Sequence, residues 1–256
     1  MNEHMILEHY KNNIRRHIDG VIHVGAHFGE SQEYYESLGA KHVVYIEAHP
    51  EVSKYLSHEM RDNPNVTVLN YAMGDVDGVV LPFHVASNGS ASSSLLKPKD
   101  HLSHYPHIKF SKTLLMVEQR TLDSLDEEGL LPSEFTYNYM TIDTQGYEMQ
   151  VIQGAKKSLE SVVWMNCELN WVEMYEDCAS ADAIDKKLKE YGLTRLNSQT
   201  QFITHESLLS TPNSDMTDEI IHGGKVYWGD GFYAKHDWVE QEIFEHDFAT
   251  EKAQSK

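Results

Sequence analysis

Two carboxylic acids follow buried apolar runs in the second half of the chain. Asp143 ends the run YMTID (139–143), and Glu168 comes near the end of VVWMNCEL (162–169). If these runs are neighbouring strands of a doubly wound sheet, both carboxylates face one cleft, because ligands lie at the carboxyl ends of such strands. A charged group there is costly unless it has a partner or a chemical role. The pair is therefore a candidate site for acid–base chemistry or ligand binding.

A glycine turn follows the first apolar run of the chain. The stretch VIHVGAHFGE (21–30) has glycine at 25 and 29, but histidine at 27 and glutamate at 30. A dinucleotide-binding turn needs glycine at 25, 27 and 30, since the backbone must approach the pyrophosphate closely. A glutamate at the start of the next helix would also repel a phosphate. No Gly-Lys-Ser or Gly-Lys-Thr sequence follows the turn, so it is poorly suited to phosphate.

The same turn suits a ligand with a cationic end and no phosphate, such as S-adenosylmethionine. Gly25 and Gly29 would let the backbone approach its methionine portion, although a lone pair of glycines more simply makes a tight turn. Glu47 ends the second apolar run, where a carboxylate can accept hydrogen bonds from both ribose hydroxyls. Small or soft side chains and an acid after the third run suit adenine and its amine. These residues are Ala72, Met73 and Asp75.

Strand and helix patterns alternate around these residues. The expected strands cover 21–25, 43–47, 65–75, 81–87, 113–120, 137–143, 162–169, 193–197 and 231–235. The expected helices cover 3–18, 31–38, 51–60, 121–129, 146–159 and 180–192. This alternation favours a parallel sheet with right-handed crossovers. A polar, serine-rich stretch over 87–112 is longer than an ordinary connection, and loops of that length are usually functional or mobile.

Composition restricts the classes of function. The chain has 256 residues, 40% of them hydrophobic, which is enough for one large domain with its own core. Its 40 acidic and 21 basic side chains give a formal charge of −19, which disfavours nucleic acid as a partner. The N-terminal stretch lacks a signal-peptide core, and no apolar run of about eighteen residues occurs. Cys167 and Cys178 have no zinc-site spacing and are expected to be reduced thiols. The sequence favours a cytoplasmic protein without membrane insertion.

Several stretches together resemble one protein family. They are VGAHFGES, YIEAHPE, NYAMGDVDG, SASSSLL, VEQRTLDSL, DTQGYEMQVIQGA and CELNW. They occur in order over about residues 20–176 and resemble the FkbM-type methyltransferases, which are S-adenosylmethionine-dependent enzymes with the class I fold. The resemblance implies methyl transfer to oxygen, often on a sugar or another small polyhydroxylated molecule.

The chain has no internal repeat and no clear domain boundary, so a single α/β methyltransferase domain is expected over residues 1–256. Its Rossmann-like, doubly wound sheet would have seven mostly parallel strands, with an inserted strand pair and loop. The core would cover about 20–236, after an N-terminal helix (1–19) and before a peripheral tail (237–256). Residues 198–230 match the family pattern poorly, and that segment can shape a different acceptor pocket. No particular oligomeric state is indicated.

The resemblance assigns site residues as well. The expected cofactor-binding residues are Gly25, Ala26, His27, Gly29, Glu47, Ala48, Ala72, Met73 and Asp75. His27 departs from the asparagine or other small polar residue of many family members. Asp143 is the first candidate for the general base that takes the proton of an acceptor hydroxyl, and Glu168 is the second. Glu148 is a third catalytic candidate, although its charge in the first turn of a helix also suits the helix dipole.

Two other groups of residues have side chains that could form a site. His101, His104 and His107 have a regular spacing, but Pro106 would interrupt a helix there, and no metal site is expected. Asp143 with Glu168 is too small a set of ligands to predict magnesium. One locally basic stretch is either a solvated face or a contact for a phosphate-bearing acceptor such as a nucleotide-linked sugar. Its residues are Lys97, Lys99, Lys109, Lys112 and Arg120.

The sequence thus predicts an S-adenosylmethionine-dependent O-methyltransferase that acts on a small polyhydroxylated acceptor, such as a sugar or glycan. A nicotinamide-dependent oxidoreductase is the first alternative, disfavoured by His27 and Glu30. The second is a module that binds S-adenosylmethionine without catalysis.

Overall fold

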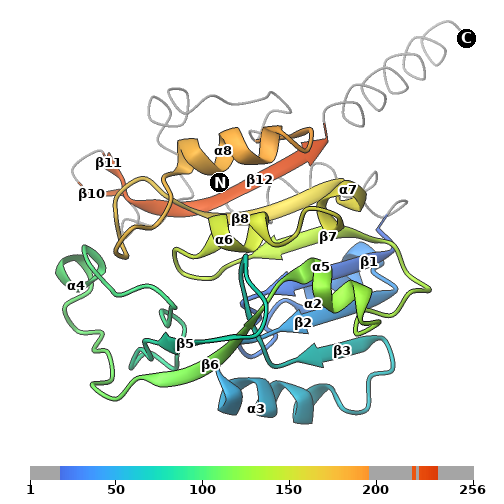
Figure 1. Cartoon of the computed structure of the whole chain (residues 1–256), viewed down its shortest axis with the longest axis horizontal. Helices are drawn as coiled ribbons and strands as arrows, with labels where there is room; N and C mark the ends of the chain where they lie inside the picture. Colours follow the sequence, from blue (N-terminus) through green and yellow to red (C-terminus); the bar gives the residue numbers. More distant parts are fainter. Residues whose placement is uncertain (1–17, 196–220, 223–224, 236–256) are drawn as a thin grey trace, which may run out of the picture.

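The fold is built around one seven-stranded sheet. The computed structural model describes residues 18–195, 221–222 and 225–235 (Figure 1). In spatial order the strands are β3 (Val66–Leu69), β2 (His42–Ile46), β1 (Gly20–Val24), β7 (Tyr137–Ile142), β8 (Trp164–Asn170), β12 (Trp228–Lys235) and β9 (Leu193–Arg195). The first five are parallel, and β12 runs antiparallel to both of its neighbours. The expected doubly wound, mostly parallel α/β sheet is confirmed.

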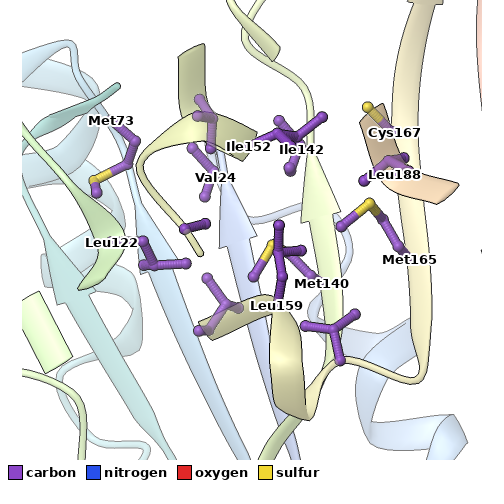
Figure 2. Close-up of a cluster of buried hydrophobic side chains, with 14 of the residues drawn as sticks. Val24, Met73, Leu122, Met140, Ile142, Ile152, Leu159, Met165, Cys167 and Leu188 are labelled. Carbon is purple, nitrogen blue, oxygen red and sulfur yellow. The ribbon is translucent and has the colours of Figure 1, made fainter. Parts of the chain in front are cut away.

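Helices cover both faces of this sheet. On one face lie α5 (Leu122–Glu127), α6 (Glu148–Gln153), α7 (Ser158–Ser161) and α8 (Ala181–Lys189), which share a core cluster with alternate residues of the strands (Figure 1). Figure 2 shows the centre of that cluster, where Val24, Met140 and Met165 meet Ile152 and Leu159. On the other face lie α2 (Gln32–Leu38) and α3 (Pro50–Met60). Every residue of β1 and β2 is buried, as expected for strands covered on both sides.

The expected inserted strand pair is present and belongs to a second sheet. Here β5 (Val79–Phe83) pairs antiparallel with β6 (Leu115–Arg120), and β4 (Ala72–Met73) pairs parallel with the other edge of β6. Residues 84–114 connect β5 to β6 and carry a short helix, α4 (His101–His104). A further pair, β10 (Ile221–His222) and β11 (Lys225–Val226), is antiparallel.

Two expected elements are divided. The strand expected over 65–75 ends at Leu69. The side-chain amide of Asn70 donates hydrogen bonds to the carbonyl oxygens of Glu47 (2.7 Å) and Ala48 (3.2 Å) at that point. The chain then starts β4 in the second sheet. The helix expected over 146–159 breaks after Gln153, where the Gly154 carbonyl accepts a hydrogen bond from the Asp123 amide instead of continuing the helix.

Other expectations fall outside the described residues. These are the N-terminal helix up to residue 17, the peripheral tail and most of 198–230. Cys167 and Cys178 are both free thiols, as expected. Among the described helices, none has the length and apolar character that a bilayer crossing needs.

A substitution at Gly154 tests whether the close contact between Gly154 and Gly74 joins the two sheets. A methyl group at this position would lie 1.9 Å from the carbonyl oxygen of Gly74, next to β4, although its φ of −90° is suitable for alanine. We expect Gly154→Ala to lower the free energy of unfolding by about 3 kcal/mol through overpacking. Gly129→Ala is the control, because it adds a methyl group in open space at a positive φ and is expected to cost about 1 kcal/mol. Urea denaturation of both variants measures the difference, and equal losses would contradict this assignment.

Candidate functional site

A cleft of about 240 Å³ opens at the carboxyl ends of β1, β2 and β7. The chain leaves β1 towards β2 on one side, while β7 lies on the other, so the cleft is at the point where the strand order reverses. Doubly wound sheets bind their ligands at such points. The turn after β1, the end of β2, β4, the loop after β5 and the turn after β7 supply its walls.

The glycine turn brings the backbone of two strands together. Gly25 has a φ of +81°, and a Cβ atom there would lie 1.7 Å from the carbonyl oxygen of Asp143. Only glycine fits this approach, and the space above it belongs to the cleft. Gly29 also has a positive φ, but its missing side chain makes room for Leu56 of α3 (2.6 Å from an added Cβ). Gly29 does not line the cleft, so its role in the structure is to pack the turn on α3.

Glu47 closes one side of the turn. Its side chain is only 7% exposed, and its carboxylate accepts hydrogen bonds from the backbone amides of His27 (2.9 Å) and His49 (2.7 Å). Burial raises the pKa of this carboxyl, and the two amide hydrogen bonds partly oppose that rise. Each carboxylate oxygen has a further lone pair beyond the one used by an amide. Glu47 therefore fits the ribose hydroxyls of an adenosyl group.

The next part of the cleft is apolar. Ala48, Ala72 and Met73 line it as expected, together with Ala26 from the turn. Two aromatic side chains, Tyr71 and Phe83, also line it and were missed by the sequence reasoning. Aliphatic and aromatic walls suit the flat faces of adenine. Asp75, expected at the adenine amine, is exposed and lies outside the cleft lining.

Asp143 and Glu168 are joined by one side-chain amide. Gln145 Nε2 donates to Asp143 Oδ1 (2.8 Å) and to Glu168 Oε1 (2.9 Å), while Gln145 Oε1 accepts from the Tyr175 hydroxyl (2.9 Å). Gln145 has a φ of +56°, which is uncommon for a residue other than glycine. Asp143 lines the cleft and Glu168 lies one strand further from it. The sequence placed both acids at neighbouring strand ends but gave no signal for the amide that links them.

Desolvation raises the pKa of each of these acids, and Asp143 raises the pKa of its acidic neighbours further. Asp143 keeps access to the cleft, yet protein surrounds it on the other sides, and this desolvation raises its pKa. Burial and then the nearby Asp143 and Glu148 carboxyls hold the pKa of Glu168 well above its usual range. Asp230, opposite Glu168 in the β8–β12 pair, keeps an exposed surface, and desolvation followed by the nearby Asp143 raises its pKa. The sequence reasoning missed Asp230. Within the described part of the chain, these four carboxyls form no ion pair with lysine or arginine.

Glu148 has local hydrogen-bond partners. Its Oε1 accepts from the Thr144 amide (2.9 Å), the Thr144 hydroxyl (3.0 Å) and the Gly146 amide (3.0 Å). It is buried and lies outside the cleft lining, and burial followed by repulsion from Asp143 raises its pKa to about 7. These contacts fix the turn that carries Gln145.

The other groups weighed from the sequence are engaged elsewhere. His101 is buried against Tyr105 and Tyr175, and no cluster of three potential metal ligands occurs among the residues that the structure describes. Most of the basic stretch makes ion pairs or a backbone contact. Lys97 pairs with Glu176 (2.5 Å), Lys99 with Glu173, Arg120 with Asp77 and Glu128, and Lys109 donates to the Pro106 carbonyl (2.5 Å).

The sequence matches a known family across this region. The model of the methyltransferase FkbM domain matches residues 23–193, which include the glycine turn, Glu47 and the Asp143–Glu168 pair. The chain belongs to the FkbM methyltransferase family. The resemblance read from the motifs is confirmed, and with it the expected methyl donor, S-adenosylmethionine. The residues of the cleft fit that donor: a backbone cradle at Gly25, an acid for the ribose and an apolar slot for adenine.

Individual relatives are more distant. The chain is 27% identical over 164 residues to the 2-O-methyltransferase NoeI of Sinorhizobium fredii (strain NBRC 101917 / NGR234). That match covers 61% of this chain and 65% of the relative, so the FkbM chain spans about two thirds of the relative's length. Among solved structures, a putative sarcosine dimethylglycine methyltransferase from Galdieria sulphuraria has 12% identity and a TM-score of 0.47, over 92% of this chain and 85% of that one. A SAM-dependent methyltransferase from Aquifex aeolicus has 11% identity and a TM-score of 0.40, over 85% and 82%.

Glu47 tests the ribose assignment. Each carboxylate oxygen of Glu47 accepts a hydrogen bond from a backbone N–H group. Glu47→Gln replaces one of these oxygens by an NH₂ group, which can accept neither from the turn nor from a ribose hydroxyl. We expect the affinity for S-adenosylhomocysteine to fall about tenfold. Titration calorimetry measures this fall, and Glu51→Gln, an exposed change on α3, is the matched control that keeps its affinity. Equal affinities for both variants would remove Glu47 from the cofactor site.

Proposed function

We propose that this FkbM protein transfers the methyl group of S-adenosylmethionine to a hydroxyl oxygen of a small polyhydroxylated acceptor, such as a sugar or glycan. The observation that carries the proposal is the pair of carboxyls, Asp143 and Glu168, held by Gln145 beside the cofactor cleft. A hydroxyl acceptor must lose a proton, and a carboxylate at the edge of the cleft is a group that can take it. The name of the relative NoeI, a 2-O-methyltransferase, supports oxygen as the acceptor atom.

Each residue of the site has a part in the proposed reaction. S-adenosylmethionine supplies an activated methyl group when it is bound. Glu47 orients the ribose, and the Gly25 backbone lets the methionine portion approach the end of β1. Most of the acceleration then comes from holding the acceptor oxygen in line with the methyl group. The chain therefore contributes mainly by positioning the reactants, and Asp143 takes the proton that the acceptor hydroxyl loses.

The hydrogen bonds distinguish the two oxygens of Asp143. Oδ1 accepts from Gln145, which leaves Oδ2 to receive the proton of the acceptor hydroxyl. Glu168 is a less suitable first base, because it lies outside the cleft lining and its strongly raised pKa favours its neutral form. A neutral Glu168 lowers the negative charge next to Asp143 and so helps Asp143 to remain ionised.

The alternatives are less well supported. A nicotinamide cofactor would bring a pyrophosphate to the turn after β1, where the Glu30 and Glu47 carboxylates line the cleft. Two anions there would repel it. A module that binds S-adenosylmethionine without catalysis would have no use for a cleft-facing acid of raised pKa, and turnover measurements distinguish it from an enzyme.

A substitution at Asp143 distinguishes an effect on cofactor binding from an effect on turnover. Asp143→Asn keeps the shape of the side chain but cannot take a proton, so we expect S-adenosylhomocysteine to bind while kcat falls by about 100-fold. Labelled-methyl transfer to a panel of free sugars, nucleotide sugars and lipid-linked glycans first identifies the acceptor and then measures the loss. Asp62→Asn, at an exposed carboxylate next to α3, is the control and keeps its kcat. An Asp143→Asn variant with unchanged kcat would show that another group takes the proton.

The pH dependence of kcat follows from the same assignment. Asp143 must be ionised to act as a base, and its pKa is raised by desolvation, so kcat should rise as the pH increases through that raised value. The midpoint will belong to the coupled carboxyls together, because Glu148 and Glu168 lie close by. Measuring kcat at saturating donor from about pH 5 to about pH 9 tests this. A profile that is flat, or that falls with increasing pH over this range, would contradict it.

A further inference from the structure

His27 connects two segments that are far apart in the sequence. Its ring Nδ1 lies 2.8 Å from Glu30 Oε1, in the same turn, and its Nε2 lies 2.9 Å from the carbonyl oxygen of Gly89. Gly89 belongs to the serine-rich loop after β5, 62 residues further along the chain. The ring therefore bridges the glycine turn and the loop.

Both partners of the ring are acceptors. A carbonyl oxygen has no proton to donate, and a carboxylate accepts only. A neutral imidazole has one N–H group, so it can satisfy one of these two partners, whereas an imidazolium ion donates to both. The geometry at His27 is therefore that of the protonated ring.

The electrostatic surroundings agree with this geometry. Burial by itself lowers the pKa of His27, but the Gly89 carbonyl and the Glu30 carboxylate outweigh it, and the pKa is raised. Among the residues that the structure describes, the charged groups that face the ring are Glu30 in the turn, Glu47 after β2 and Asp143 after β7, and all three are acidic. The backbone at His27 also has a φ of +49°, an uncommon conformation for a residue with a side chain.

The loop that His27 reaches forms one wall of the cleft. Ser90, Ala91 and Ser93 line the cleft together with residues of the glycine turn. The residues that follow the tip, 92–94, are attached independently, because the Ser94 hydroxyl donates to the Gln145 carbonyl (2.8 Å) and the Ser94 amide donates to the His84 carbonyl (3.2 Å).

The tip of the loop, residues 88–91, has fewer attachments. Its other hydrogen bonds are to neighbouring loop residues, such as Ala91 to Asn88 (3.4 Å) and Ser90 to Ser93 (2.7 Å). Among the hydrogen bonds of the described residues, the one that joins the tip to another part of the fold is the bond from His27. Loss of that bond would release the tip while leaving Ser94 attached.

We propose that protonated His27 is a positioning residue that holds the tip of the loop over the cofactor cleft by donating one hydrogen bond to Glu30 and one to the Gly89 carbonyl. The inference rests on the proposed function, in that the cleft beneath the tip is taken as the site of S-adenosylmethionine. His27 acts through the loop, so its contribution is to how tightly the donor is held.

The sign of the pH effect follows from the charge. A raised pKa means that the folded state favours the protonated ring. The clasp, meaning the two hydrogen bonds from the His27 ring to Glu30 and Gly89, is therefore complete below the ordinary histidine pKa and is lost as the pH rises through the raised value. Binding of S-adenosylhomocysteine should therefore weaken as the pH rises through that interval. This is opposite in direction to the dependence of kcat on the ionisation of Asp143, so the two effects can be told apart.

The test combines a titration with two variants. Histidine Cε1-labelled protein, with the His27 signal assigned by its absence in His27→Gln, gives the pKa of the ring directly by NMR. Glu30→Gln keeps an acceptor but removes the carboxylate charge, so it should lower that pKa. His27→Gln keeps a single donor group, so it should weaken S-adenosylhomocysteine binding by about fivefold at low pH and remove its pH dependence. His58→Gln, an exposed change on α3, is the control.

Hydrogen exchange of the peptide containing residues 88–91 provides a readout that needs no ligand. We expect faster exchange at the tip in His27→Gln than in wild type or His58→Gln, with no change at Ser94, whose amide donates to the His84 carbonyl. A His27 pKa at or below that of exposed histidines, or unchanged exchange at the tip, would overturn the clasp. Failure of the wild-type protein to bind S-adenosylhomocysteine would instead overturn the proposed function, and the titration and the exchange would still decide whether the clasp exists.

Discussion

The site depends on a backbone contact between β1 and β7. The Asp143 amide donates to the Val24 carbonyl (3.0 Å), and the absent side chain of Gly25 leaves room for the Asp143 carbonyl. This contact places the glycine turn and Asp143, the first catalytic candidate, next to each other at the bottom of the cleft. The Gly25 amide in turn donates to Ile46 at the end of β2, one residue before Glu47 (2.9 Å). Three strand ends are thus fixed relative to one another before any side chain is considered, and the cleft has a rigid base.

Several carboxyl groups lie close together around the floor of the cleft, and no lysine or arginine of the described residues pairs with them. Asp143, Glu168 and Asp230 come from three neighbouring strands, and a neutral amide from Gln145 joins two of them. Protonation of some of these carboxyls lowers the cost of placing them together, which is the physical meaning of their raised pKa values. A cationic methyl donor would reduce the same repulsion. In the proposed function, the acids would therefore favour the binding of the donor, and Asp143 would also take the proton of the acceptor.

The sequence predicted the parts of the site that local patterns determine. Apolar runs located the core strands, and the acids at their ends, Glu47, Asp143 and Glu168, do lie around one region of the fold. The missed residues depend on contacts between distant segments. Gln145 matters because a positive φ directs its amide between two strands, and Phe83 reaches the cleft from the second sheet. The clasp from His27 joins residues 62 positions apart, and no spacing within either segment indicates it. Gly29 looked like a ligand-facing glycine, yet it makes room for Leu56, a difference that only packing can reveal.

The inserted sheet also bears on how members of such a fold diverge. Phe83 and Leu115 are cross-strand partners, so the chain leaves the second sheet and returns to it at the same place. Everything between them, residues 84–114, can change in length without altering the register of β5 and β6, since a longer loop costs little extra closure entropy. Residues 96–114 of this connection do not line the cleft, so changes of length confined to them would leave the turn after β1 and the end of β2 in place. The connection is thus the part of the fold in which a change of length disturbs the two sheets least.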